Sequence, residues 1–309
     1  MIDVDTFVTI LYVMVDDFCQ LHQCDQARHP GPAAALSCSE VVALALFGQW
    51  VQFPSERAFY RYAERHLRAA FPTLPDRSQF NRLQRQHMAA LVAFGLYLVQ
   101  VQQAQHWLYE CLDSSGIPTR DAKRRGTGWL AGQADIGWSN RIGWYEGFHM
   151  LIAIAKDGMI SGFGFGSAST HDQRLMETFL AARARPIEQL ASVGEKAQGV
   201  YIADKGFAGA LPHAIWRARF DAEVITPPHQ SSKKTWPKDW RRWLAHLRQL
   251  VETVYAKLLN AFRLARERPH ALTGFQARLA AKVSLHNFCI WLNGFLQRDP
   301  LAFANLIDW

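Results

Sequence analysis

The sequence predicts an α/β protein in which a helical N-terminal part precedes a mixed sheet flanked by helices. Two observations support this prediction. Residues 7–103 contain helical patterns separated by Pro-rich and Gly-rich breaks, whereas strand and helix patterns alternate from residue 106 onward. The 309-residue chain is 49% hydrophobic and 20% charged, so it has enough apolar material for a large core, and wholesale disorder is excluded.

The N-terminal domain, which we place at residues 1–105, is predicted to be all-helical. Ser37 and Glu40 have the spacing of a capping box, which indicates that a helix begins there. Other cap residues and prolines mark the remaining helix starts. The expected helices cover residues 7–21, 40–50, a segment opening at 54–55, and 76–103.

The second domain, placed at residues 106–298, is predicted to contain a mixed sheet, and residues 299–309 form a C-terminal tail. Asp157 and Gly158 between two apolar runs predict a hairpin. Hairpin-linked strands followed by helix-linked strands are typical of a mixed sheet with helices on its faces. Residues 114–132 are expected to be a loop. The expected strands are 107–112, 148–155, 159–165, 200–203 and 222–226, and the expected helices are 171–183, 207–217, 240–262 and 274–295.

Composition favours an intracellular, cytoplasmic protein. The longest apolar stretch, residues 89–101, is shorter than the ~20 residues that a membrane-spanning helix needs. Asp3 and Asp5 precede the first apolar run, where a signal peptide would carry basic residues. The five cysteines form no even, closely spaced framework, which suits a reducing compartment.

Two cysteines and two histidines lie close together in the sequence: Cys19, His22, Cys24 and His29. They leave a zinc site open as an alternative. Zinc ligands usually occur as two arms separated by a longer loop, and Cys19 lies on an expected buried helix. We therefore expect these cysteines to be core thiols.

Three carboxylates occupy positions that favour chemistry. Asp113 follows the first strand of the second domain, Asp204 follows the fourth, and Glu252 lies on the long helix. Each also has a local explanation: a turn or cap for Asp113, a helix cap for Asp204, and pairing with Arg248 for Glu252. Together at the strand ends, they would need a cation, and two Mg²⁺ ions held in this way support phosphoryl transfer.

These acids and their surroundings resemble the DDE transposases of bacterial insertion sequences. The matching strings are Leu-Asp-Ser-Ser around Asp113, Asp-Lys-Gly-Phe from Asp204, and Arg-Gln-Leu-Val-Glu-Thr-Val-Tyr around Glu252. Gly-Phe-His-Met-Leu-Ile and Gly-Ser-Ala-Ser-Thr-His-Asp also match. The resemblance covers roughly residues 108–287 and implies a ribonuclease H-like catalytic fold. It further implies that the three acids hold two Mg²⁺ ions, for which Mn²⁺ can substitute.

The resemblance implies an enzyme that hydrolyses a phosphodiester at the element ends and then joins the freed 3′-hydroxyl to target DNA. The implied partners are double-stranded DNA, as terminal inverted repeats and target, and a second copy of the chain in a homodimer on DNA. The implied location is the cytoplasm, at the nucleoid. Two alternatives remain open: a catalytically inactive DNA-binding descendant, and a ribonuclease H-like nuclease without strand transfer.

The chain departs from a signature that many members of this family carry around the last acid, Tyr-x2-Arg-x3-Glu-x6-Lys. Arg248 and Glu252 match it, whereas Ala245 and Leu259 stand at the Tyr and Lys positions, and Lys257 is out of register. These departures concern the side chains that would hold the DNA end.

Two histidines are candidates for contacting the three acids and orienting them. His149 stands at a strand position that is often Lys in the family. His171 precedes Asp172 beside the hairpin, although a helix start explains Asp172 equally well.

Basic residues suggest where DNA would bind. The formal net charge of +7 falls within residues 229–268, where Trp236, Trp240 and Trp243 are interleaved with the cations. Cations neutralise phosphates and aromatic rings stack on bases, so we favour DNA contact over a solvated basic loop with core tryptophans. A second basic helix face, Arg57, Arg61, Arg65 and Arg68, is equally compatible with DNA or solvent. The candidate DNA-binding residues are Lys205, Lys233, Lys234, Lys238, Arg241, Arg242, Arg248 and Lys257, with Arg124 and Arg125 in the loop after Asp113.

Overall fold

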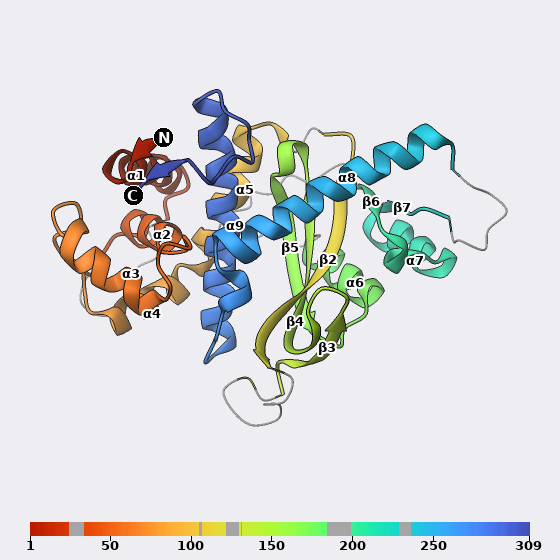
Figure 1. The fold of residues 1–309 in the computed structure, drawn as a ribbon, viewed down its shortest axis with the longest axis horizontal. Coiled ribbons are helices and arrows are strands. Elements are labelled where there is room, and N and C mark those ends of the chain that lie inside the picture. The colour runs from red at the N-terminus through yellow and green to blue at the C-terminus, as the bar shows by residue number, and fades with distance from the viewer. Residues whose placement is uncertain (25–33, 105–106, 122–129, 131, 184–198, 229–235) are drawn as a thin grey trace. The chain divides into compact units, whose positions relative to one another are not determined.

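The computed structural model describes residues 1–24, 34–104, 107–121, 130, 132–183, 199–228 and 236–309 (Figure 1). The chain forms two compact units. One comprises residues 1–98, 258–264 and 269–309, and the other comprises residues 99–257 and 265–268. The last helix therefore groups with the N-terminal helices, whereas the predicted boundaries placed it in the second domain.

The helical unit is built around its last helix. α9 (Leu272–Phe295) is apolar on all sides and almost entirely buried. Two of its buried polar side chains bond to other segments of the unit: Lys282 donates to Gln49 Oε1 at 2.6 Å, and Asn287 donates to the Gly95 carbonyl at 2.9 Å. The other helices of this unit in the described chain are α1 (Val4–Leu21), α2 (Cys38–Phe47), α3 (Glu56–Tyr62), α4 (Arg77–Gln86) and α5 (Met88–Val101), and two-residue strands β1 (Ile2–Asp3) and β8 (Ile307–Asp308) pair in parallel.

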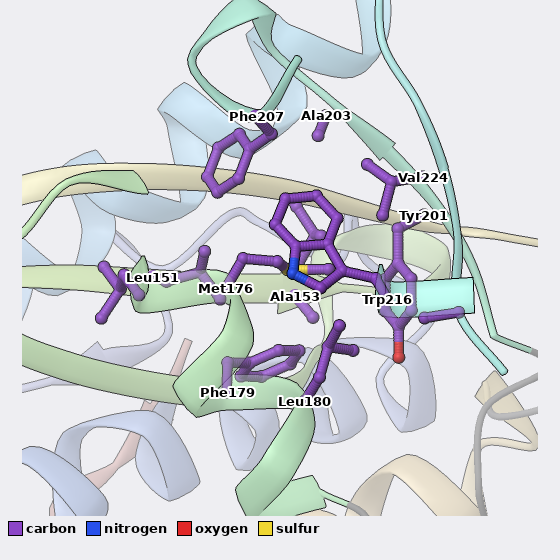
Figure 2. Close-up of a cluster of buried hydrophobic side chains, with 13 residues drawn as sticks. Leu151, Ala153, Met176, Phe179, Leu180, Tyr201, Ala203, Phe207, Trp216 and Val224 are labelled. Atoms are coloured by element: carbon purple, nitrogen blue, oxygen red, sulfur yellow. The ribbon is translucent and has the colours of Figure 1, made fainter. Parts of the chain in front are cut away.

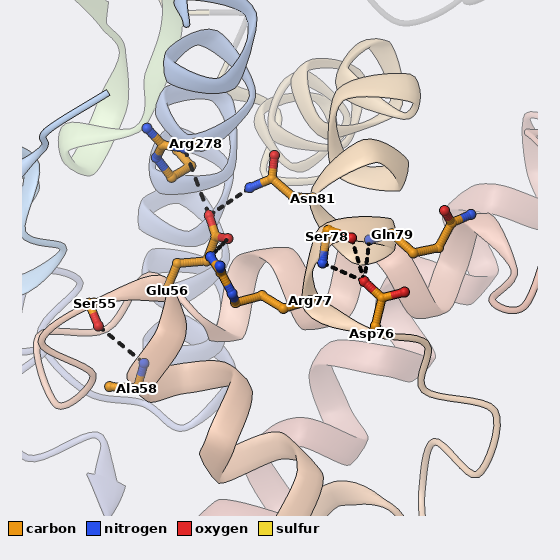
Figure 3. Close-up of polar contacts among 9 residues, drawn as sticks. All are labelled: Ser55, Glu56, Ala58, Asp76, Arg77, Ser78, Gln79, Asn81 and Arg278. Carbon is orange, nitrogen blue, oxygen red and sulfur yellow. Dashed lines mark hydrogen bonds and ion pairs between the residues drawn. The ribbon is translucent and has the colours of Figure 1, made fainter. Parts of the chain in front are cut away.

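Caps mark three helix starts of this unit at the predicted residues, whereas α1 begins at Val4 rather than residue 7 and α9 at Leu272 rather than residue 274. The capping box is present, because the Ser37 N–H donates to Glu40 Oε2 and the Glu40 N–H donates to Ser37 Oγ. Figure 3 shows the caps at Ser55 and Asp76, whose side chains accept backbone N–H groups of the following helices. Glu56 of α3 also accepts a hydrogen bond from Asn81 of α4 at 2.8 Å. Local sequence thus determines where these helices begin.

One helix prediction for this unit needs correction, and one helix ends in an unexpected way. The segment expected as one helix over residues 76–103 is two helices, α4 and α5, which meet at His87. The break separates a mostly polar helix from an apolar one, so α5 can enter the core while α4 keeps its polar face in solvent. The α3 helix ends in a π-helical turn, Ala63–Leu67, and the predicted arginine face lies exposed across it.

The α/β unit contains the predicted mixed sheet (Figure 1). β4 is antiparallel to β2 along one edge, and its other edge pairs first with β3 and then with β5. β2, β6 and β7 are parallel neighbours in that order. The strands are β2 (Glu110–Asp121), β3 (Asp135–Ser139), β4 (Gly143–Ile154), β5 (Ile160–Ser167), β6 (Val200–Ala203) and β7 (Glu223–Ile225), and the helices are α6 (Asp172–Arg183), α7 (Ala210–Phe220) and α8 (Lys238–Ala256).

The core of this unit lies between the sheet and helices α6 and α7. Figure 2 shows Leu151 and Ala153 of β4 facing Met176, Phe179 and Leu180 of α6. Side chains of β2, β6, β7 and α7 complete the cluster. Successive side chains of a strand point to opposite faces, so Leu112 of β2 enters this core while its neighbour Asp113 does not.

The loop predicted over residues 114–132 is wrong for its first part. β2 continues from Ser114 to Asp121 because β4 supplies a backbone partner along this whole length. Gly116 permits the pairing, since the ring of Tyr145 occupies the space that a Cβ atom would need. Strand β3 was also missed. The predictions of two hairpin-linked strands and a helix over residues 148–183 are confirmed by β4, β5 and α6, and strand β6 is also confirmed. Asp157 and Gly158 in the hairpin turn both have positive φ.

Candidate active site

The sheet register brings Asp113 and Asp204 to neighbouring strands. Leu112 of β2 is paired with Ala203 of β6, and the two aspartates are the next residues on these parallel strands. Asp113 is partly buried, and its Oδ1 accepts the Ser114 N–H at 2.8 Å. Asp204 ends β6 and caps the 3₁₀ turn Lys205–Phe207, accepting the Lys205 N–H at 2.7 Å. Asp204 therefore has the predicted capping role and also stands at the end of β6.

Burial makes the ionised form of Asp113 costly. It raises the pKa of this carboxyl to about 6, against an ordinary value of 3.8. The hydrogen bond from Ser114 acts in the opposite direction, the charge on Asp204 raises the pKa further, Arg248 lowers it, and Asp172 raises it slightly. Because carboxylates outnumber the neighbouring cation, this corner of the sheet favours a bound positive charge.

Helix α8 supplies the counter-charge. The Arg248 guanidinium contacts both oxygens of Asp204, with Nη2 at 3.3 Å from Oδ2 and Nη1 at 3.4 Å from Oδ1. Both side chains remain accessible, which limits the pair's contribution to stability. The pairing of Arg248 with Glu252, the local explanation for that acid, does not occur among the described residues, because Arg248 reaches across to the sheet.

Tyr255 anchors α8 to the sheet. Its buried hydroxyl lies 3.0 Å from the carbonyl oxygen of Asp113 and 2.8 Å from that of Met150, and donates to both. Glu252 is four residues after Arg248 and three before Tyr255, so helix periodicity places it on the same side of α8, between them. Its side chain is exposed. Arg248 and Tyr255 thus hold this face of α8 against Asp204 and β2.

A second layer of contacts lies behind Asp113. Asp172, the first residue of α6, accepts the Ser114 hydroxyl at 2.6 Å and lies 3.5 Å from His149 Nε2. The other ring nitrogen of His149 lies 2.8 Å from the Thr170 carbonyl. Asp172 also occupies the space next to Gly206 that a Cβ atom would need. It thereby connects β2, β4 and the turn that follows Asp204.

Sequence reasoning placed His149 here but undervalued Asp172. The sequence pattern at Asp172 is that of an ordinary helix start, and only the string that ends in His-Asp marked it. His171 is exposed at the start of α6, and no contact of its side chain with the acids occurs in the described residues. Of the two histidines, the structure brings only His149 into this network.

The candidate DNA-binding residues other than Arg248 fall into three groups. Lys205, Lys238, Arg241 and Arg242 are exposed, either beside Asp204 or on the first turns of α8. Lys257 is half-buried where α8 ends, and Leu259, the family's Lys position, is buried, so no cation stands there. The predicted contacts Lys233, Lys234, Arg124 and Arg125 lie outside the described residues.

Aromatic rings follow the basic end of α8. Trp240 is 55% exposed and makes an edge contact with Trp236, at a centroid distance of 5.8 Å, and a contact with Trp243 at 6.4 Å. Trp243 in turn contacts Tyr109 at 5.3 Å. Trp240 is therefore the most exposed ring of this row, whereas Trp236 and Trp243 are half-buried.

The fold and the site together define a class of protein. A mixed sheet in which β5, β4, β2, β6 and β7 are neighbours in that order, flanked by helices, is consistent with a ribonuclease H-like transposase. Asp113 lies within β2, and Asp204 directly follows β6. Residues 111–288 match the family model described as "Transposase DDE domain", and the chain belongs to this family. This confirms the resemblance seen in the sequence. Neither the curated proteins nor the solved structures give a match to the chain.

Family membership makes this a transposase-type protein of DNA transposition and recombination, for which DNA is the substrate and divalent metal ions are the general cofactor. In the described part of the chain, no helix combines the length and the apolar character that crossing a membrane would require.

Proposed function

We propose that the chain is the DNA transposase of an insertion sequence, which hydrolyses a phosphodiester at each element end and joins the freed 3′-hydroxyl to target DNA. The observation that carries the proposal is the meeting of Asp113 and Asp204 on neighbouring parallel strands, with Arg248 of the Glu252-bearing helix paired to Asp204. Family membership supports the same function.

The residues fit a hard divalent cation. The candidate ligands are all carboxylate oxygens, which Mg²⁺ prefers. Around Asp113, the charges of Asp204 and Asp172 are opposed by the single cation Arg248. We propose that Asp113, Asp204 and Glu252 hold two Mg²⁺ ions, with Mn²⁺ as a substitute. When bound, such ions activate the attacking water or hydroxyl and stabilise charge on the leaving oxygen.

The chain's own residues prepare the site for this chemistry. Asp113 must be ionised to act as a ligand, so its proton would pass to solvent when an ion binds. The Ser114 N–H and the Tyr255 hydroxyl hold the Asp113 segment in place. Arg248 orients Asp204 and keeps guanidinium N–H groups available for a phosphate.

The exposed cations suggest a path for DNA toward the acids. Lys238, Arg241 and Arg242 on α8 can neutralise backbone phosphates, and Lys205 lies next to Asp204. Trp240 offers an exposed ring on which an unpaired base at a cut end can stack. The partners are then the terminal inverted repeats, target DNA and a second copy of the chain on DNA, and the location is the cytoplasm, at the nucleoid.

The test uses the purified chain with Mg²⁺, a DNA fragment carrying an element end and a target plasmid. The end sequence is taken from inverted repeats that flank the gene. We expect cut ends and joined products from the wild type, and a loss of at least ~100-fold in Asp113→Asn, Asp204→Asn and Glu252→Gln, because each removes a ligand charge. Asp157→Asn, which changes an exposed acid in a turn, is the matched control.

Three outcomes would contradict the proposal. Full activity of Asp113→Asn would remove the acids from the mechanism. Cut ends without joined products would indicate a nuclease without strand transfer. DNA binding without any cutting, in Mg²⁺ and in Mn²⁺, would indicate an inactive DNA-binding descendant.

A further inference from the structure

Three cysteines from two helices converge in the helical unit. The sulfur atoms of Cys19, Cys24 and Cys38 all lie within 4.8 Å of one another. Cys19 is in the last turn of α1, Cys24 follows that helix, and Cys38 is the first residue of α2. All three thiols are free of disulfides. Cys38, which the sequence pattern did not connect with the other two, completes the cluster.

The backbone builds this cluster at a defined helix end. Gln23 adopts a left-handed conformation with φ of 53°, which turns the chain back on itself. The Cys24 N–H then donates to the Cys19 carbonyl at 3.0 Å, and the Gln23 N–H donates to the Gln20 carbonyl at 3.3 Å, the two bonds of a Schellman motif. The turn places Cys24 beside Cys19, one helical turn back.

A second contact brings α2 to the same place. The Ser39 hydroxyl donates to Asp16 Oδ1 at 2.7 Å, which joins the first turn of α2 to α1. Cys38 precedes Ser39 and is buried, with 1% of its surface exposed. The three thiols are therefore held by the packing of two helices as well as by the turn.

The spacing suits a tetrahedral metal ion. Zinc binds thiolates at ~2.3 Å in a tetrahedron, which puts neighbouring sulfurs about 3.8 Å apart, within the observed limit. Cys19 and Cys38 are buried, while Cys24 is half-buried and gives the ion a route from solvent. A closed, sulfur-rich cluster of this kind is typical of structural zinc rather than of a magnesium site.

Two histidines lie near the cluster. The side chains of His22 and His87 are both close enough to Cys24 to interact with it electrostatically. Each carries a ring nitrogen of the kind that completes a Cys₃His site.

We propose that Cys19, Cys24 and Cys38 bind one structural zinc ion, which links the end of α1 to the start of α2, with a nitrogen of His22 or His87 in the fourth position. The site is separate in chemistry from the carboxylates of the proposed active site and does not depend on the proposed function.

The test measures metal content by elemental mass spectrometry. The chain carries Asp113→Asn and Asp204→Asn, so that zinc at the carboxylates does not contribute, and it is purified under reducing conditions, loaded with zinc and dialysed. We expect about one zinc ion per chain in this background and a loss of at least ~10-fold on adding Cys24→Ser or Cys38→Ser. Cys289→Ala, which removes a buried thiol elsewhere in the same unit, keeps the ion.

Cobalt loading gives a second readout. Thiolate ligands produce an intense charge-transfer absorption with Co²⁺, which we expect in the background chain and in Cys289→Ala but not in Cys24→Ser. Far-UV circular dichroism checks that Cys24→Ser still folds, and this variant is the mildest because Cys24 is half-buried. Zinc affinity is also measured in His22→Gln and in His87→Gln, and the variant that binds zinc more weakly identifies the fourth ligand.

Four results would overturn the proposal. They are zinc content unchanged in a folded Cys24→Ser chain, no zinc retained by the background chain, no charge-transfer absorption with cobalt, and a disulfide between two of the three cysteines in protein alkylated at the moment of lysis.

Discussion

Replacing Asp113 by Asn should stabilise the metal-free protein while removing its activity. The folded state holds the pKa of Asp113 at about 6, against 3.8 ordinarily, because burial and the charges of Asp204 and Asp172 outweigh the opposing Ser114 hydrogen bond and Arg248. Folding therefore favours the protonated acid. The stability that this proton contributes is complete below pH 3.8 and is lost as the pH rises through 6.

The structure sets the size of the effect. A shift of about two pKa units corresponds to about 3 kcal/mol, which is the upper limit of the cost of ionising Asp113 at pH 7.5. Asn removes this cost and keeps the hydrogen bond that the Ser114 N–H makes with Oδ1. We expect Asp113→Asn to raise the free energy of unfolding by ~1–3 kcal/mol at pH 7.5 and by much less near pH 4.

The assay is urea unfolding in EDTA at several pH values, followed by circular dichroism. Hydrogen exchange of peptides from β2 and β4 assigns the change to the α/β unit. Excess Mg²⁺ should reverse the order, because an ion that binds only the native wild type adds ~2.7 kcal/mol at a concentration of 100 Kd. A variant less stable than the wild type at pH 7.5 in EDTA, or a difference that does not change with pH, would refute the reasoning.

Three further predictions concern the residues around this site. Tyr255→Phe should lower the free energy of unfolding by ~1–3 kcal/mol, because two carbonyls lose a buried donor. Tyr60→Phe is the control and should be neutral, since the Tyr60 hydroxyl is buried with no hydrogen-bond partner in the described residues. Equal urea midpoints for the two variants would contradict this prediction. Glu110→Gln should lower the free energy of unfolding by about 3 kcal/mol, because the Arg183 guanidinium, which bonds to Glu110 at 2.6 and 2.8 Å, loses its buried counter-charge. A loss below ~1 kcal/mol in the same assay would show that the pair is not desolvated. Arg248→Ala should change stability by less than ~0.5 kcal/mol, because the pair is exposed, yet reduce DNA cutting at least ~10-fold with partial rescue in Arg248→Lys; cutting at the wild-type rate would exclude Arg248 from the site.

Much of the fold was predictable where interactions within a short stretch of chain determine the local structure. The capping box at Ser37, the hairpin turn at Asp157 and strand β6 all form as the local pattern indicates. The acids were also recognisable, because Asp113 and Asp204 follow apolar runs that pair as parallel strands. In these cases neighbours in the sequence are the partners that matter.

The remainder depended on partners far away in the chain. Ser114 to Asp121 has little strand character of its own and becomes part of β2 only because β4 pairs with it. Arg248 bonds to Asp204 rather than to Glu252 on its own helix, since α8 is held against the sheet by Tyr255. Asp172 resembles an ordinary helix start until Ser114 and His149 are brought to it.

The sequence by itself therefore determined the class of fold and the family, and it predicted the three acids. Tertiary structure decided which residues surround those acids, to which unit the last helix belongs, and that Cys38 lies beside Cys19 and Cys24. The physical reason is that caps, turns and periodicity act over a few residues, whereas burial, charge and side-chain contact depend on segments that only packing brings together.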